Sequence, residues 1–171
     1  MQPRLFLMGM PGSGKSTLGK RLATKLELPF IDLDEYIETK EKKTIEIIFE
    51  QEGEAGFRNM ESRYLKEVIE TQKVFLLSLG GGTPCFNDNL SLVQQNGFSI
   101  YLQLSPEALF SRIKNATQVR PLFKGLTDEE LLNKLKEMLL KREPYYNQAR
   151  LCLPGLSVKP EEVAQQLLTA L

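Results

Sequence analysis

The chain has 171 residues, of which 22 are basic and 22 acidic, and its isoelectric point is about 6.4. This balance excludes a protein whose overall field attracts nucleic acid or an anionic membrane, so we expect small molecules as partners. There is no histidine, and Cys85 and Cys152 show no metal-ligand spacing, which predicts free thiols in a reducing compartment. Because the sequence has no apolar run of about 18 residues and no leader-like segment, we expect a cytoplasmic protein. We also expect it to be a monomer.

Five short apolar runs predict the strands of a parallel α/β sheet. They alternate with helical stretches, which is typical of parallel strands joined by crossover helices. The length is close to that of one domain, about 150 residues, so we expect a single domain over residues 1–171. The predicted strands are 5–8, 29–32, 74–79, 99–104 and 151–153.

The segments between the strands predict a helical insert and a flap. A helix at 17–26 follows the first strand, and apolar spacing predicts three helices, over 34–40, 44–52 and 57–70, before the third strand. We therefore expect a helical insert at about 33–62.

After the fourth predicted strand, residues 114–126 form a polar segment with the composition of a mobile flap. Thr127 then begins a long helix, through about Ala149, with a capping-box sequence. A final amphipathic helix opens at Pro160.

The most informative motif is GMPGSGKST at residues 9–17, between the first strand and its helix. It has the pattern of a P-loop, in which glycines let the backbone N–H groups surround phosphates. Lys15 brings a cation to the β- and γ-phosphates, and the Ser16 hydroxyl ligates Mg²⁺. A glycine-rich turn with a helix cap is the structural alternative. The preceding strand and following helix favour phosphate binding.

Two carboxylates, Asp32 and Asp34, stand at the end of the second predicted strand. Strand alternation places both on one side, and the carboxyl ends of parallel strands open on the cleft where the P-loop lies. One carboxylate could orient the metal shell while the other accepts a hydroxyl proton. The alternative is a helix cap, which suits Asp34 in particular.

Three consecutive glycines, 80 to 82, follow the third strand and predict a close approach of ligand to backbone, with a flexible turn as the alternative. Arg58, Arg120 and Arg142 each offer a planar pair of donors for a carboxylate or a phosphate, although isolated arginines are usually solvated. Glu61 lies three residues after Arg58 on a predicted helix, close enough to hold its guanidinium.

Together these segments make the chain resemble the shikimate kinase family over nearly its full length. Their order and spacing match throughout, and the FRxxE and triple-glycine elements after DxD are far more specific than the P-loop alone. The matching segments are GMPGSGKST at 9–17, FIDLD at 30–34, GEAGFRNME at 53–61, LGGG at 79–82, RPL at 120–122 and REPY at 142–145.

The resemblance implies both a fold and a reaction. The fold is a five-stranded parallel sheet of the P-loop NTPase type, strand order 2-3-1-4-5, with a helical substrate-binding insert and a lid. The reaction is transfer of the γ-phosphoryl group of ATP to the 3-hydroxyl of shikimate, with Mg²⁺, in aromatic amino acid biosynthesis. The products are shikimate 3-phosphate and ADP.

The resemblance also implies roles for individual residues. Asp34 binds the reacting hydroxyl as the candidate base, and Arg120 on the lid meets the transferring phosphoryl group, so these two and Lys15 are the catalytic residues. Ser16 and Asp32 hold the metal. The implied ATP-binding residues are Gly12, Ser13, Gly14, Lys15, Ser16, Thr17, Arg112 and Arg120.

On the acceptor side, Arg58 and Arg142 are implied to clamp the shikimate carboxylate. Gly81 and Gly82 bring backbone close to the ring, and Glu61 steadies Arg58. The sequence departs from the family after Tyr145, where Ala149 is followed by Arg150 instead of aspartate. For that reason we assign no adenine contacts in 157–160.

Two other functions remain open from the sequence. A related small-metabolite kinase, such as a gluconate kinase, would share the P-loop and lid but lack the arginine pair in this context. A nucleotide-binding regulator without catalysis is the second. The regulator is disfavoured because a protein without catalysis has no chemical need for all five residues that phosphoryl transfer uses. These residues are Lys15, Ser16, Asp32, Asp34 and Arg120.

Overall fold

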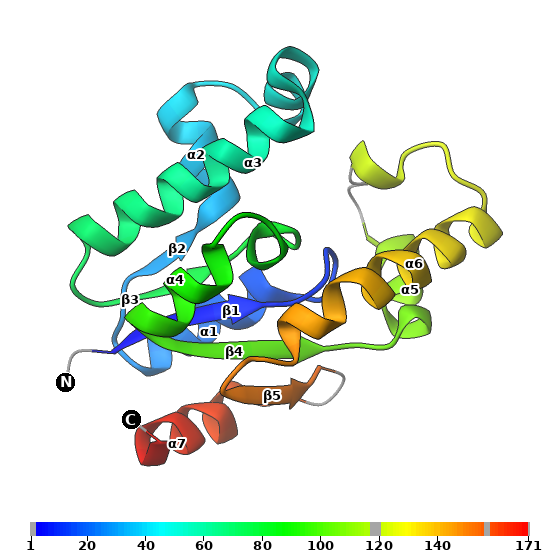
Figure 1. Cartoon of the computed structure of the whole chain (residues 1–171). Coiled ribbons are helices and arrows are strands. Elements are labelled where there is room, and N and C mark those ends of the chain that lie inside the picture. Colours follow the sequence, from blue (N-terminus) through cyan, green and yellow to red (C-terminus); the bar gives the residue numbers. More distant parts are fainter. Residues whose placement is uncertain (1–2, 117–120, 156–157, 171) are drawn as a thin grey trace.

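Five parallel strands form the sheet at the centre of the molecule (Figure 1). The computed structural model describes residues 3–116, 121–155 and 158–170. The strand order is β2-β3-β1-β4-β5, which confirms the order implied by the family resemblance. The strands are β1 (Arg4–Met8), β2 (Phe30–Asp32), β3 (Phe75–Ser78), β4 (Phe98–Gln103) and β5 (Leu151–Pro154).

Helices connect the strands and cover both faces of the sheet. The α-helices are α1 (Lys15–Lys25), α2 (Leu33–Glu41), α3 (Ile45–Thr71), α4 (Asn89–Asn96), α5 (Pro106–Lys114), α6 (Asp128–Tyr146) and α7 (Pro160–Ala170). Two short 3₁₀ turns are η1 (Thr83–Cys85) and η2 (Pro121–Phe123). Within the described residues, every helix is too short or too polar to cross a lipid bilayer.

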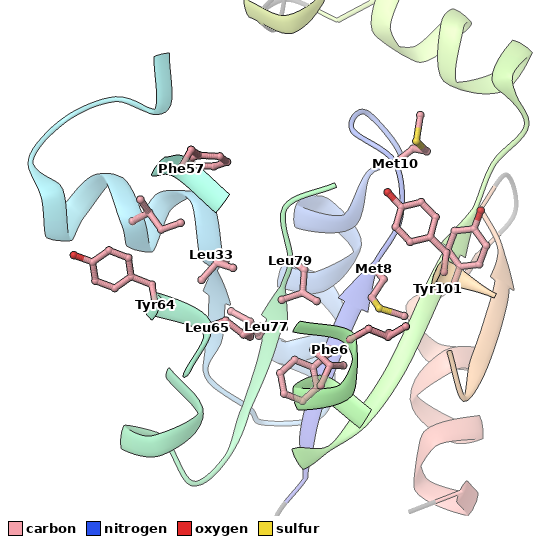
Figure 2. Close-up of a cluster of buried hydrophobic side chains, with 14 of the residues drawn as sticks. Phe6, Met8, Met10, Leu33, Phe57, Tyr64, Leu65, Leu77, Leu79 and Tyr101 are labelled. Atoms are coloured by element: carbon pink, nitrogen blue, oxygen red, sulfur yellow. The ribbon is translucent and has the colours of Figure 1, made fainter. Parts of the chain in front are cut away.

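Alternation along β1 divides the core into two layers. Phe6 and Met8 point to the face covered by α2 to α6, where they pack with Leu77 of β3 (Figure 2). Leu5 and Leu7 point to the opposite face, which α1 and α7 cover. All four side chains are fully buried. A strand buried on both faces reads as a continuous apolar run, which is why this strand was predictable from sequence.

The helical segment before β3 is broken where the sequence predicts a break, but over fewer residues. The helices expected at 44–52 and 57–70 form α3, in which a kink at Gly53, with φ 67° and ψ −177°, separates two helical parts between Ile45 and Thr71. Gly56 stays helical, and a Cβ atom there would lie 2.6 Å from the Cβ of Glu52. The close approach therefore explains Gly56 without a turn.

The strand order determines where the loops converge. Since β1 lies between β3 and β4, the loop after β1 opens at the point where the chain connections diverge to the two sides of the sheet. In Figure 1, α2 with the first turns of α3 stands on one side of this loop, and the segment leading into α6 stands on the other. Ligands bind at such a point in open parallel sheets.

Candidate active site

The loop between β1 and α1 has the geometry of a phosphate-binding turn. Gly12 and Gly14 have φ angles of 81° and 91°, in the left-handed region that glycine adopts without steric cost. Gly14 is the N-cap of α1, and no side chain in the described part of the protein caps that helix. The N–H groups of its first turn can therefore bind an anion, which the helix dipole also favours.

Lys15 and Ser16 extend from the first turn of α1. The Lys15 ammonium donates hydrogen bonds of 2.9 Å to the carbonyl oxygens of Gly9 and Met10, so the lysine is held against the loop. The Ser16 hydroxyl donates a hydrogen bond of 2.6 Å to Asp32 Oδ2. This contact joins the loop after β1 to the end of β2.

The two predicted carboxylates do not follow strand alternation. β2 ends at Asp32, which is the N-cap of α2 and accepts hydrogen bonds from the backbone N–H groups of Asp34 and Glu35. The cap is therefore Asp32 and not Asp34, which lies in the first turn of α2. Both carboxylates nevertheless line the same cavity, because the strand turns directly into the helix.

A cavity of about 610 Å³ opens above the P-loop, and most of the residues predicted to bind the nucleotide and the metal line it. Its remaining walls come from the first turns of α2, the end of β3 and the end of α5. The predicted residues that line it are Gly12, Gly14, Lys15, Ser16, Thr17, Asp32, Asp34, Gly81 and Arg112.

Arg112 of α5 separates this cavity from a second one of about 210 Å³. Its guanidinium donates to the carbonyl oxygens of Ser13, at 2.8 Å, and Gly155, at 3.2 Å, and so spans the P-loop and the loop after β5. The smaller cavity is lined by Ser13, Leu102, Val158 and Pro160 among others. A planar cation beside a partly apolar cavity can stack on an aromatic base.

The glycines after β3 are required by close approaches on three sides. A Cβ atom at Gly80 would lie 2.7 Å from Glu61 Oε1 and 3.1 Å from Asp34 Oδ1. At Gly81 it would lie 3.1 Å from Arg142 Nη1, and at Gly82 2.5 Å from Arg58 Nη1. Side chains on consecutive glycines would therefore displace these charged groups.

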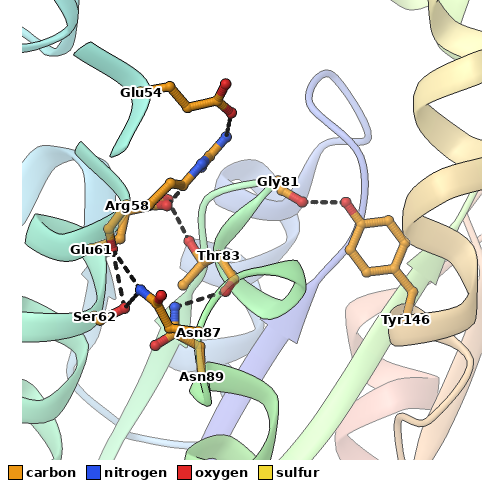
Figure 3. A network of polar contacts seen from close by, with 9 residues as sticks. All are labelled: Glu54, Arg58, Glu61, Ser62, Gly81, Thr83, Asn87, Asn89 and Tyr146. Atoms are coloured by element: carbon orange, nitrogen blue, oxygen red, sulfur yellow. Dashed lines mark hydrogen bonds and ion pairs between the residues drawn. The ribbon is translucent and has the colours of Figure 1, made fainter. Parts of the chain in front are cut away.

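Arg58 is held in place by a buried carboxylate. Its Nη1 atom lies 2.6 Å from Glu61 Oε2, and Glu61 is 1% exposed. The other Glu61 oxygen accepts a hydrogen bond of 2.6 Å from the Thr83 hydroxyl (Figure 3). The guanidinium also lies 4.2 Å from the centre of the Phe86 ring, a cation–π contact. These contacts leave Arg58 little freedom.

Two guanidinium nitrogens near the glycines are buried without a hydrogen-bond partner in the described part of the chain. Arg58 Nε and Arg142 Nη1 make no hydrogen bond to any described residue. Burial raises the pKa of the Cys85 thiol to about 11, although Arg142 and Arg58 act in the opposite direction, so this neighbour stays neutral and does not neutralise them. Buried donors without partners are costly, and an anionic ligand would satisfy them.

The structure thus brings together most of the residues predicted from sequence. Arg120 lies outside the described residues, as does part of the predicted flap. Arg58, Gly82 and Arg142 do not line the large cavity and gather instead around the glycine loop. The sequence prediction missed Thr83, for which no motif gave a signal, and Tyr146, which follows Arg142 by four residues on the same helix and could have been found by that spacing.

The strand order, the P-loop with its lysine, and the paired carboxylates beside it define a P-loop nucleotide-binding protein. The arginines around the glycine loop add buried donors that an anion would satisfy. A family model for shikimate kinase matches residues 11–171. A shikimate kinase of Bacteroides thetaiotaomicron is 46% identical over 147 residues, 86% of this chain and 83% of that protein.

Solved structures agree with this result. A crystal structure of shikimate kinase from Bacteroides thetaiotaomicron has a TM-score of 0.91 at 42% identity, covering 99% of both chains. A shikimate kinase from Acinetobacter baumannii, solved in complex with shikimate, has a TM-score of 0.87 at 33% identity, covering 99% of this chain and 93% of the other. The chain belongs to the shikimate kinase family, and it is a kinase.

Proposed function

We propose that this protein transfers the γ-phosphoryl group of ATP to the 3-hydroxyl of shikimate, forming shikimate 3-phosphate and ADP. In this reaction the bond between the γ-phosphorus and the β–γ bridging oxygen breaks, and a bond from the shikimate 3-oxygen to that phosphorus forms. The proton leaves the hydroxyl toward Asp34, which lines the cavity beside the P-loop.

The observation that best supports this acceptor is the convergence of Arg58 and Arg142 on the glycine loop. The two residues come from α3 and α6, and each carries a buried guanidinium nitrogen without a hydrogen-bond partner among the described residues. Their approach to neighbouring glycines places both within reach of one small anion. A carboxylate accepts hydrogen bonds from two guanidinium groups at once, so it satisfies both donors.

The nucleotide would lie over the P-loop, with its phosphates against the first turn of α1 and Lys15. The adenine would lie beside Arg112. Ser16 and Asp32 would hold Mg²⁺, because both offer oxygen atoms, which this ion prefers, and their hydrogen bond brings the two groups to one point. When bound with ATP, the ion neutralises charge on the phosphates.

The remaining assignments belong to the same proposal. Residues 1–171 form one kinase domain, in which 33–62 is the substrate-binding insert and 114–126 is a lid carrying Arg120 toward the transferring group. The balanced charge of the chain supports a protein without nucleic acid or membrane partners, and its location in the cytoplasm is part of the same proposal. We propose that it acts as a monomer.

A coupled ADP-release assay tests the proposal with ATP, Mg²⁺ and a panel of acceptors: shikimate, quinate, gluconate and nucleoside monophosphates. We expect shikimate to give the highest kcat/KM, and ³¹P-coupled NMR of the product to place phosphate on the 3-oxygen. A preference for gluconate or for a nucleotide acceptor would contradict the substrate assignment. ATP binding without turnover on any acceptor would favour a non-catalytic regulator.

A further inference from the structure

The inner face of α6 ends in two polar residues that meet the glycine loop. Leu131, Leu135 and Leu139 are buried along this face. Arg142 and Tyr146 continue it, and residues four apart on a helix lie side by side. The carboxyl end of α6 therefore presents a cation and a phenol to the same part of the site.

The Tyr146 hydroxyl donates a hydrogen bond to the carbonyl oxygen of Gly81 (Figure 3). The Arg142 guanidinium also lies against Gly81, because its Nη1 atom would be 3.1 Å from a Cβ atom there. Burial raises the pKa of this phenol, and the adjacent Arg142 guanidinium offsets the rise only in part. Because the hydroxyl keeps its proton, it remains a donor to Gly81, and its oxygen can accept from Arg142.

Holding the Gly81 carbonyl also fixes the neighbouring peptide group. The carbonyl of Gly81 and the N–H of Gly82 belong to one planar trans peptide and point in opposite directions. Gly81 has no room for a side chain, since a Cβ atom there would lie 2.6 Å from Pro11 Cδ and 3.1 Å from Arg142 Nη1. A rotation of this peptide group would therefore change its packing against both Pro11 of the P-loop and Arg142.

We propose that Tyr146 is a positioning residue for the acceptor substrate: its hydroxyl holds the Gly81 peptide and the Arg142 guanidinium in a fixed relation before the substrate binds. The inference rests on the proposed function of the Arg58 and Arg142 site. Its physical basis is preorganisation, since an arginine already oriented loses less side-chain entropy on binding a carboxylate.

Tyr101 provides a matched control for this hydroxyl. Its ring lies 5.0 Å from the ring of Tyr146, and both side chains are buried. The Tyr101 hydroxyl, however, has no hydrogen-bond partner among the described residues. Tyr101→Phe thus removes the same group from the same aromatic pair without touching Gly81 or Arg142.

The test measures steady-state kinetics and Tm for Tyr146→Phe and Tyr101→Phe. We expect Tyr146→Phe to raise the KM for shikimate by about 5- to 30-fold, because a buried carbonyl loses its donor and Arg142 loses its neighbour. The KM for ATP should stay within about twofold of wild type. Tyr101→Phe should leave both KM values unchanged. Equal effects of the two variants, or equal losses toward ATP and shikimate, would overturn the proposal.

A second measurement separates positioning from a general loss of stability. In an Arg142→Ala background, Tyr146→Phe should raise the shikimate KM much less than it does in the wild type, because the residue it orients is absent. Additive effects would overturn the proposal even if both tyrosine variants were destabilised. A wild-type enzyme that does not phosphorylate shikimate would refute the proposed function instead, which is a distinct outcome.

Discussion

Lys15 is the residue through which the phosphate side of the site is organised. Its ammonium lies against the carbonyl oxygens of Gly9 and Met10. Lys15→Met keeps the bulk of the side-chain stem but removes the cation, so we expect kcat to fall by at least about 10²-fold in a folded protein. The control is Lys20→Met, which changes an exposed lysine of the same helix. Near-wild-type turnover of Lys15→Met would contradict the phosphate role.

Asp34 tests the chemistry of the acceptor hydroxyl. An amide can hydrogen-bond that hydroxyl but cannot take its proton, so Asp34→Asn should reduce kcat by about 10²- to 10⁴-fold while ATP binding persists. Calorimetric titration measures the affinity of the variant for ATP. Asp88→Asn, on an exposed residue before α4, is the control. A loss below about tenfold would make Asp34 a residue that positions the substrate and not a base.

Single residues were predictable where a backbone requirement or a motif fixed them. The P-loop glycines and Lys15 fall in this class, because phosphate binding prescribes their spacing. The helix-cap alternative favoured Asp34, whereas Asp32 caps α2, since the sequence does not reveal that β2 passes directly into the helix. Thr83 was missed because its partner Glu61 is distant along the chain, and such contacts leave no local pattern.

At the scale of elements, the break in α3 is the feature most open to test. Gly53 has φ 67° and ψ −177°, a conformation essentially restricted to glycine, and no atom of the described residues lies within 4 Å of where its Cβ would be. Gly53→Ala should therefore cost about 1 to 3 kcal/mol through the backbone alone and lower Tm by several degrees. Calorimetry measures the change. A rise in Tm, as for glycine to alanine in a regular helix, would show that the break is dispensable.

The helices and strands were easier to predict than their boundaries and their order in the sheet. The buried runs of β1 and β4 and the capping box at Thr127 gave clear signals, and the capping box is present with both of its hydrogen bonds. The long helix ends at Tyr146 and not near Ala149, where Asn147 and the residues after it form a turn. The strand order itself came from the family resemblance, because alternation of elements predicts a parallel sheet but not its order.

At the scale of the whole molecule, the absence of histidine predicts a stability that is flat near neutral pH. Hydrogen bonds from Tyr64 to Glu41, and from Lys40 to Glu67, lower the pKa of both carboxyls. Groups with a lowered folded pKa stabilise the protein above their unfolded value and lose that contribution as pH falls through the folded pKa. We expect the urea midpoint to be constant between roughly pH 5.5 and 8.5 and to fall in acid below about pH 4.5.

Stability at alkaline pH depends on buried groups that are neutral in the folded protein. Burial raises the pKa of Cys85 from 9.0 to about 11 and that of Tyr101 from 10.0 to about 12. An acid with a raised folded pKa contributes stability below its unfolded pKa, and this is lost as pH rises toward the folded value. The urea midpoint should thus decline above about pH 9. Cys85→Ala should reduce this decline of the urea midpoint more than Cys152→Ala does. A steep change of the wild-type midpoint between pH 6 and 8 would contradict the expected pH dependence.

Arg58 of α3 and Arg142 of α6 are the two residues proposed to recognise the carboxylate of the acceptor. Truncating one partner of a buried charge pair costs about 2 to 5 kcal/mol, so Arg142→Ala should raise the shikimate KM at least about 30-fold with little change for ATP. Arg58→Ala should do the same. It would also leave the buried Glu61 carboxylate without its cation, so its Tm must be measured in parallel.

The most direct measurement compares shikimate with its carboxamide in the wild type and in Arg142→Ala. The carboxamide should be a poor substrate for the wild type, because it offers no anion to the arginines. Against the carboxamide, Arg142→Ala should lose far less activity than against shikimate, since the group that Arg142 serves is already gone. If the variant instead lost activity equally with shikimate and with the carboxamide, the two arginines would not recognise the carboxylate, and the substrate assignment would be wrong.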